Sequence, residues 1–204
     1  MSIEPLQCHT IGHSVYPIDE FITFLKENGI NCIVDVRSSP YSRFASQYNR
    51  EILGDELKKA GILYLFMGDS LGARYDDPEL LYADGKVDFE RVRATDAFKM
   101  GITRVVDGLK KGYSISLMCS EKEPFDCHRF VLVSKALIDM GIEVLHVTPD
   151  TVIANSELED RLFKKYKLSR HDLFSSEEEN VADVYRRRNI DIAYNAKTKE
   201  GDDE

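Results

Sequence analysis

Short apolar runs alternate, along the first 150 residues, with stretches whose apolar side chains recur at helical spacing. The runs predict five β-strands, at residues 6–11, 32–36, 62–66, 113–119 and 143–147. The second run, Cys32-Ile33-Val34-Asp35-Val36, is apolar on both faces except at Asp35, which is typical of a strand covered on both sides. The alternation predicts an α/β fold, with an open, mostly parallel five-stranded sheet and helices on both faces.

The segments between these runs predict the covering helices. They are expected from Ile18 to a stop at Asn28-Gly29, within the stretch from Glu51 to Ala60, over residues 89–98 and 102–109 with a break near Gly101, and from a cap at Asp126 to Gly141. Residues 68–87 are rich in Gly, Asp and Pro and predict a long loop. After residue 150 the sequence is rich in charged residues and has the spacing of helices. Residues 1–150 are therefore expected to form the α/β domain, and residues 151–204 a helical extension and polar tail packed on it.

Charge and composition narrow the function classes. Among 204 residues, 27 are Lys or Arg and 36 are Asp or Glu, so the formal net charge of -9 disfavours non-specific binding to DNA or to an anionic membrane. No apolar run approaches the roughly 20 residues of a membrane span, and the start, Met1-Ser2-Ile3-Glu4-Pro5, lacks a secretory pattern. Four cysteines are too few for a disulfide scaffold, so reduced thiols and a cytoplasmic location are expected. The triplet Arg186-Arg187-Arg188 is interpreted as a solvated helix face.

Residues that can carry chemistry gather in the loops after the predicted strands, where open α/β sheets bind their ligands. The expected substrate-binding residues are Arg37, Ser39, Arg43, Arg74, Cys119, His128 and Arg129. Guanidinium groups bind phosphate or carboxylate in a bidentate way and stay charged at any working pH. A helix beginning at Asp126 would add free N–H groups. The pattern predicts a site for a small phosphate-bearing molecule or a nucleic-acid end.

Three residues are the candidates for catalysis. Cys127, in the first turn of the predicted helix and beside two cationic residues, is expected to be a nucleophile with a lowered thiol pKa. Glu121 and His13 are candidates for proton transfer. Each has a structural alternative, which is a packed thiol for Cys127, a salt bridge for Glu121 and a hydrogen-bonding role for His13. Structural alternatives also exist for the arginines, since Arg37 can pair with Asp35 while Arg43 and Arg74 can be solvated, and Cys119 can simply be packed.

Other chemistries have less support from the sequence. Neither Cys119 nor Cys127 is followed, six residues later, by the arginine of a thiol-phosphatase or sulfurtransferase loop. Phosphate-binding and dinucleotide-binding glycine motifs are absent from the sequence. Cys119, Cys127 and His128, together with His13, are zinc-type ligands. Their spacing is not that of a ribbon or finger, however, and an adjacent Cys and His rarely point at one ion, so no metal or other cofactor is expected.

The strand-end motifs resemble those of the domain of unknown function 488 family. The matching segments are Thr10-Ile11-Gly12-His13-Ser14, Asp35-Val36-Arg37-Ser38-Ser39-Pro40 with Ser42-Arg43, Leu71-Gly72-Ala73-Arg74, Cys119-Ser120-Glu121 with Cys127-His128-Arg129, and the late Ile192-Ala193-Tyr194. The resemblance covers residues 8–148 and implies a compact α/β protein whose activity is not generally established. Ala73 stands where the family has a second glycine, and its added methyl group restricts the loop at this point.

Three functions remain open from the sequence. The first is an enzyme acting on a phosphate-bearing substrate through the Arg/Cys/His/Glu pocket. The second is a non-catalytic module that binds a nucleotide or a partner, with structural cysteines. The third is a metal- or thiol-dependent redox protein.

Overall fold

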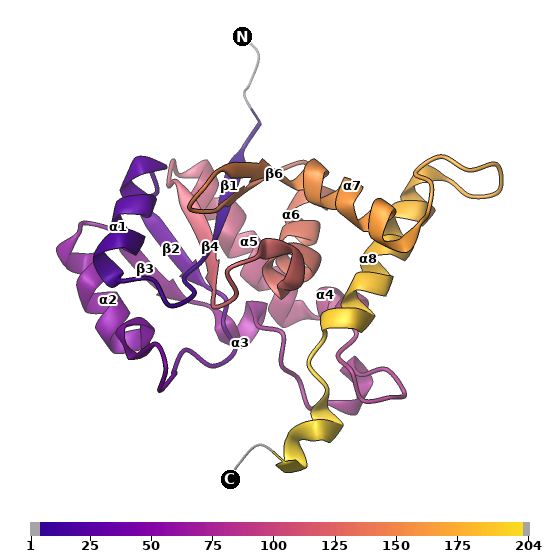
Figure 1. The fold of residues 1–204 in the computed structure, drawn as a ribbon, viewed down its shortest axis with the longest axis horizontal. Coiled ribbons are helices and arrows are strands. Elements are labelled where there is room, and N and C mark those ends of the chain that lie inside the picture. The colour runs from indigo at the N-terminus through magenta and orange to yellow at the C-terminus, as the bar shows by residue number, and fades with distance from the viewer. Residues whose placement is uncertain (1–4, 202–204) are drawn as a thin grey trace.

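A six-stranded, mostly parallel β-sheet forms the centre of the computed structural model, which describes residues 5–201 (Figure 1). Its strands are β1 (Gln7–Gly12), β2 (Cys32–Asp35), β3 (Leu63–Phe66), β4 (Ile115–Cys119), β5 (Glu143–Val147) and β6 (Val152–Ala154). They lie in the order β3-β2-β4-β1-β5-β6, and among them only β6 runs antiparallel to its neighbour. The predicted α/β class and the mostly parallel open sheet are confirmed.

The sixth strand corrects the expectation of five. After β5 the chain turns where the Thr148 N–H donates to the Thr151 carbonyl at 2.9 Å. The Thr151 N–H in turn donates to Thr148 Oγ1 at 3.2 Å. The three residues of β6 then pair with β5, within the segment expected to be helical. A run this short shows no alternation along the sequence, and this explains why periodicity does not reveal it.

Eight α-helices lie within the described residues. They are α1 (Ile18–Glu27), α2 (Arg50–Lys59), α3 (Gly68–Leu71), α4 (Phe89–Ala94), α5 (Asp96–Lys110), α6 (Lys135–Asp139), α7 (Asn155–Tyr166) and α8 (Glu177–Ile192). Short 3₁₀ turns occur at Ser46–Tyr48, Pro78–Leu80, Pro124–Asp126 and Ala196–Gly201, and a wide π-helical turn at Arg129–Ser134 leads into α6. None of these helices has the length and apolar composition that crossing a membrane requires.

The helices cover both faces of the sheet. Successive strand residues point to opposite faces, so Ile33 and Val34 of β2 belong to different cores. Ile33 packs with α1 and α2, whereas Val34 shares the larger core with α4, α5, α6, α7 and α8. Figure 1 shows α1 and α2 on the side of the sheet away from the later helices. This arrangement leaves the carboxyl ends of β1, β2 and β4 side by side.

Gly101 has a different role from the predicted one. The break between the two helices lies earlier, at Thr95, whose side chain accepts a hydrogen bond from the Phe98 N–H at 3.2 Å. Gly101 is buried inside α5, where a Cβ would lie only 2.9 Å from Leu71 Cδ2. Glycine here therefore permits close approach of α3, which itself lies in the segment predicted to be loop.

A buried polar chain links the C-terminal helices to the sheet. Thr10 of β1 hydrogen-bonds His146 Nδ1 at 2.8 Å, and His146 Nε2 meets Asn155 Oδ1 at 3.1 Å. Asn155 donates to the Tyr185 hydroxyl of α8 at 3.1 Å. Residues after 150 thus share the core of the sheet.

Both ends of the chain lie outside the described range. These are residues 202–204, which end the predicted polar tail, and residues 1–4, where the sequence shows no secretory pattern.

Burial lowers the pKa of His146 to about 4, so the folded chain holds this ring neutral at neutral pH. The unfolded chain takes up the proton near the ordinary value of 6.5, so the contribution of His146 to stability is complete above that value and is lost as pH falls toward 4. We expect this ring to remove about 2 kcal/mol of stability between pH 7.5 and 5. Urea unfolding at both pH values will measure it. His146→Gln should flatten the dependence, and the exposed control His171→Gln should not; an unchanged slope in His146→Gln would refute the assignment.

Candidate functional site

Three neighbouring strand ends are held together beyond the regular sheet. The His13 N–H donates to the Cys119 carbonyl at 2.9 Å, and the Ser14 N–H donates to the Ser120 carbonyl at 2.9 Å. On the other side of β4, the Val36 N–H donates to the Met118 carbonyl at 3.0 Å. These bonds extend the pairing of β1, β4 and β2 into the following loops. The chemistry-bearing loops therefore start from a rigid edge.

Arg37 is fixed by Asp35, as one of the sequence interpretations allowed. Its Nε and Nη2 donate to the two carboxylate oxygens of Asp35 at 2.9 and 2.6 Å, and both residues are buried. Tyr64 donates to the same carboxylate at 2.6 Å, and Arg37 Nη2 also donates to the Tyr48 carbonyl at 2.9 Å. Its charge is thus largely neutralised, while its Nη1 remains directed toward His13 at 3.1 Å from Nε2.

The contacts of His13 determine its tautomer. Arg37 can only donate, so His13 Nε2 accepts, and Nδ1 carries the proton that is donated to the Ser14 carbonyl at 2.7 Å. The ring also stacks on Tyr48, with centroids 4.0 Å apart. Burial, followed by the charge of Arg37, lowers the pKa of His13 to about 4. His13 is consequently neutral at pH 7, with both ring nitrogens occupied.

Arg129 supports the loop after β4 from within. Its side chain is fully buried, and Nη1 and Nη2 donate to the carbonyls of Glu121 and Lys122 at 2.6 and 3.0 Å. Its Nε has no hydrogen-bond partner, and no carboxylate of the described residues forms an ion pair with it. The loop passes directly over Gly12, where a Cβ would lie 1.9 Å from the Glu121 carbonyl oxygen. Two cavities open at these strand ends, and Arg129 lines neither of them, so its role is to shape the loop.

Cys119, Glu121, Cys127 and His128 form one cluster, whose sulfur, carboxylate and imidazole atoms all lie within 4.8 Å of one another. The Cys127 thiol donates to Glu121 Oε2 at 3.0 Å. His128 Nδ1 lies 3.7 Å from Cys119 Sγ and 3.9 Å from Cys127 Sγ. His128 Nε2 donates to the Val36 carbonyl at 3.1 Å. The adjacent Cys127 and His128 thus do converge, contrary to the expectation from the sequence that they would not.

Burial and charge act differently on the four groups. Burial raises the pKa of Cys119 and that of Glu121. Burial also opposes ionisation of Cys127, but a hydrogen bond from Cys119 and the positive charges of Arg129 and His128 together lower the pKa of its thiol. For His128, the effect of burial is outweighed by Cys127 and Glu121, which raise its pKa.

The helix predicted to begin at Asp126 begins later. Pro124–Asp126 forms a separate 3₁₀ turn, and Cys127 has extended backbone angles, with φ -125° and ψ 144°. The π-helical turn starts at Arg129, whose N–H donates to Cys127 Sγ at 3.4 Å. Cys127 therefore precedes the first turn, and the first N–H of the helical segment faces this sulfur rather than an open anion site.

A cavity of about 230 Å³ opens beside the cluster. Six of the predicted site residues line it: Arg37, Ser39, Arg74, Cys119, Glu121 and His128. Arg74 is exposed at its rim, 5.5 Å from the ring centre of Tyr194, and has no ion-pair partner in the part of the chain described. A second hollow of about 350 Å³ shares Arg37, Ser39 and Glu121 with the first and also contains His13.

Some of the predicted site residues do not reach the cavity. Cys127 lies behind Glu121 and His128, since it is only 2 % exposed and is not part of the cavity wall. Arg43 is exposed and lines neither hollow. The four arginines of the sequence hypothesis therefore do not converge on one point. Only Arg37 and Arg74 reach the cavity, and the first is already paired.

The sequence analysis missed several parts of the site. Ser38 Oγ accepts hydrogen bonds from the N–H groups of Ala73 and Arg74 at 2.9 and 3.1 Å and so positions the Arg74 loop. Arg188, interpreted as solvated, is only 5 % exposed; it pairs with Asp126 and donates to the Phe125 carbonyl at 3.1 Å. The signal was helical spacing, because Arg188 lies one turn after the buried Val184.

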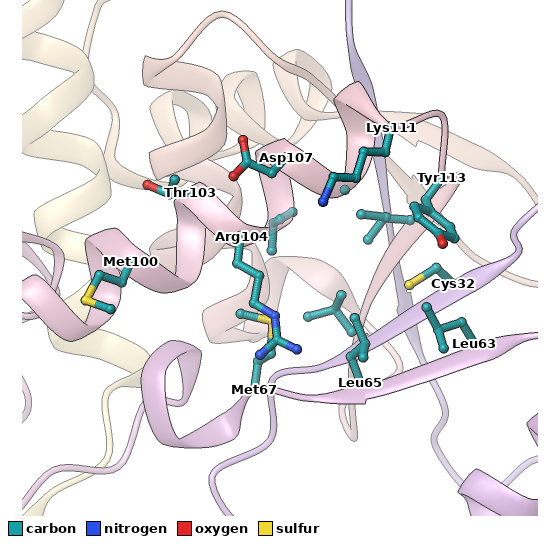
Figure 2. A pocket seen from close by; sticks show the side chains of 14 residues that line it. Cys32, Leu63, Leu65, Met67, Met100, Thr103, Arg104, Asp107, Lys111 and Tyr113 are labelled. Carbon is teal, nitrogen blue, oxygen red and sulfur yellow. The ribbon is translucent and has the colours of Figure 1, made fainter.

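A larger hollow lies elsewhere, between β3 and α5. It measures about 520 Å³, and Figure 2 shows Leu63 and Leu65 on its strand side and Met100 and Arg104 on its helix side. Its walls are mainly apolar and contain none of the predicted site residues. The candidate site is therefore the cavity of about 230 Å³, because the predicted site residues line that cavity.

Comparison with known proteins gives one match. A family model described as "Domain of unknown function DUF488" matches residues 17–136, more than half of the chain. The matched range contains Arg37, Arg74, Glu121 and Cys127, while His13 lies just before it. No protein with a curated description and no solved structure matches the chain.

The loop over Gly12 predicts a specific sensitivity. Gly12→Ala would place a methyl group against the Glu121 carbonyl, which is backbone and cannot rotate away, so we expect a loss of about 1–3 kcal/mol of stability. Gly54→Ala is the matched control, since its Cβ would contact only Tyr64 Cδ1, at 3.6 Å, within a helix. Thermal unfolding should show a lower Tm for Gly12→Ala alone. An unchanged Tm would mean that the loop does not pack as described.

Proposed function

This chain belongs to the DUF488 family, whose description assigns no activity, and we propose from its site that it is an enzyme acting on a small phosphate-bearing substrate. The observation that carries the proposal is one cavity, at the carboxyl ends of the strands, whose wall combines anion-binding groups with reactive groups. Arg74 and Ser39 supply the first kind, and Cys119, Glu121 and His128 the second.

The anion-binding part of the wall suits a single phosphate group. Arg74 is free of ion pairs among the described residues and can turn toward the cavity at the cost of its contact with Tyr194. The hydroxyl of Ser39 is a further donor there. A volume of about 230 Å³ accepts a phosphate with a small attached group, so a larger substrate such as a nucleotide or nucleic-acid end would enter by its phosphate only.

The reactive part of the wall includes Glu121, which lines both hollows and carries a carboxyl of raised pKa. We expect it to exchange protons with the substrate. Cys127, the nucleophile candidate of the sequence analysis, stands behind Glu121 and is given a supporting role by this geometry. His13, neutral and fixed by Arg37, keeps that guanidinium oriented at the boundary of the two hollows.

Arg74→Ala tests the binding half of the proposal. With inorganic phosphate, AMP and a 5′-phosphorylated oligonucleotide as probes, calorimetry should show binding to the unaltered chain that weakens about 10-fold or more in Arg74→Ala. The matched control is Arg50→Ala, because Arg50 is also exposed and lies over an aromatic ring, that of Phe66, at 4.3 Å. Arg50→Ala should bind like the unaltered chain.

Two results would contradict the proposal. If none of the three phosphate probes binds the unaltered chain, the proposal of a phosphate-bearing substrate is refuted. Binding that persists with no turnover of any phosphate-bearing compound would instead favour the non-catalytic binding module.

A further inference from the structure

We propose that Cys119, Cys127 and His128, with Glu121 as a fourth and displaceable ligand, bind one divalent transition-metal ion of the zinc class. The site itself is argued from geometry; its use in catalysis rests on the function proposed above. The donor set of two sulfurs, one imidazole nitrogen and one carboxylate oxygen matches the ligands that zinc takes in proteins.

The two sulfur–nitrogen distances in the cluster already suit a tetrahedral ion. With Zn–S near 2.3 Å and Zn–N near 2.0–2.1 Å, tetrahedral geometry separates sulfur from nitrogen by about 3.6 Å. His128 Nδ1 lies 3.7 Å from one sulfur and 3.9 Å from the other, within a few tenths of an ångström of that separation. The Glu121 oxygen, now 3.0 Å from Cys127 Sγ, needs only to move outward.

The outer contacts hold these ligands in place. Metal-binding histidines commonly donate their other ring N–H to a carbonyl or carboxylate, and His128 Nε2 donates to the Val36 carbonyl at 3.1 Å. Nδ1 is thereby left to face the two sulfurs. Cys119 ends β4, and Cys127 Sγ accepts the Arg129 N–H, so both thiols are tied to ordered backbone.

Charge balance supplies an independent argument. Two thiolates and one carboxylate around a divalent cation leave one net negative charge. The fully buried Arg129 has no ion-pair partner among residues 5–201, and its Nε is unbonded. A buried charge without a carboxylate partner is costly. The Arg129 guanidinium donates to the backbone carbonyl of Glu121 at 2.6 Å, so an anionic metal cluster that includes Glu121 would lie beside this charge and offset it.

Position relative to the cavity sets what the ion can do. Cys119, Glu121 and His128 line the cavity wall and Cys127 lies behind them, so one side of the ion would face the substrate. Displacement of Glu121 by a water or a phosphate oxygen would give the open coordination position typical of catalytic zinc. Metal uptake also releases the thiol protons to solvent.

The test uses the reduced full chain, purified without chelator or polyhistidine tag. Elemental analysis should find one equivalent of metal per chain, and titration of the metal-free protein with Co²⁺ should develop the thiolate and ligand-field absorption bands of a tetrahedral site. Cys119→Ala and His128→Ala should weaken binding at least ~100-fold, since even outer contacts of metal ligands are worth 10–100-fold. Cys32→Ala is the matched control, as a buried cysteine on the neighbouring strand outside the cluster, and should bind normally.

Several outcomes would overturn the site. These are the absence of stoichiometric binding of Zn²⁺ or Co²⁺ to the reduced chain, binding that survives both cluster substitutions, or a Cys119–Cys127 disulfide whose reduction does not restore metal binding. The proposed function fails separately. Arg74→Ala should keep its cobalt spectrum, so loss of phosphate binding there leaves the metal site standing. If the chain binds phosphate but no metal, the metal site is refuted and the proposed function stands.

Discussion

Arg129 lies fully buried behind the loop that follows β4 and donates hydrogen bonds to the carbonyls of Glu121 and Lys122. Carbonyl groups in a loop need partners, and leaving one of them buried and unpaired costs about 1–3 kcal/mol. The guanidinium satisfies both and folds the loop back over Gly12. This contact fixes the backbone of Glu121, whose carboxylate accepts a hydrogen bond from Cys127 and so completes the cluster with Cys119 and His128.

The sheet order explains why distant segments meet. The central strands run β2, β4, β1, so the loops after residues 35, 119 and 12 leave the sheet next to one another. β4 is the strand between the other two, and it supplies Cys119 directly. Val36, from the loop after β2, holds His128, and His13, from the loop after β1, holds Arg37. The order of the strands thus converts separate motifs into one site.

Much of this could be predicted from the sequence. Apolar runs and helical spacing identify the parallel strands and the layered class. Strand-end loops identify six of the residues that line the cavity, which are Arg37, Ser39, Arg74, Cys119, Glu121 and His128. The sequence could not show the direction in which each arginine side chain points. The sequence allowed the pairing of Arg37 with Asp35, but it gave no sign that the side chain of Arg129 would bond to loop carbonyls inside the protein. The side-chain direction of an arginine depends on its three-dimensional neighbours.

The sequence analysis named Cys119, Cys127 and His128 as zinc-type ligands, but their spacing along the chain argued against a shared ion. Ligand spacing along the chain is regular only when one hairpin or helix supplies the ligands, whereas here a strand end, a loop and the residues before a π-helical turn contribute. The turn itself has no sequence signature, because Pro124 and Asp126 resemble an ordinary helix start. β6 is too short to show a strand pattern in the sequence. Arg188 was interpreted as solvated from its charge, although its position in the helix, one turn after the buried Val184, indicates burial.

Ile192 and Tyr194 form part of the cavity wall, although they lie far beyond the range matched by the family model. Arg188 anchors this end of the chain by holding Asp126 and the Phe125 carbonyl. One part of the cavity wall therefore comes from a segment separate from the loops that carry Cys119, Glu121 and His128. For the substrate proposed above, changes in this last segment would alter the space in the cavity without replacing the side chains proposed to react.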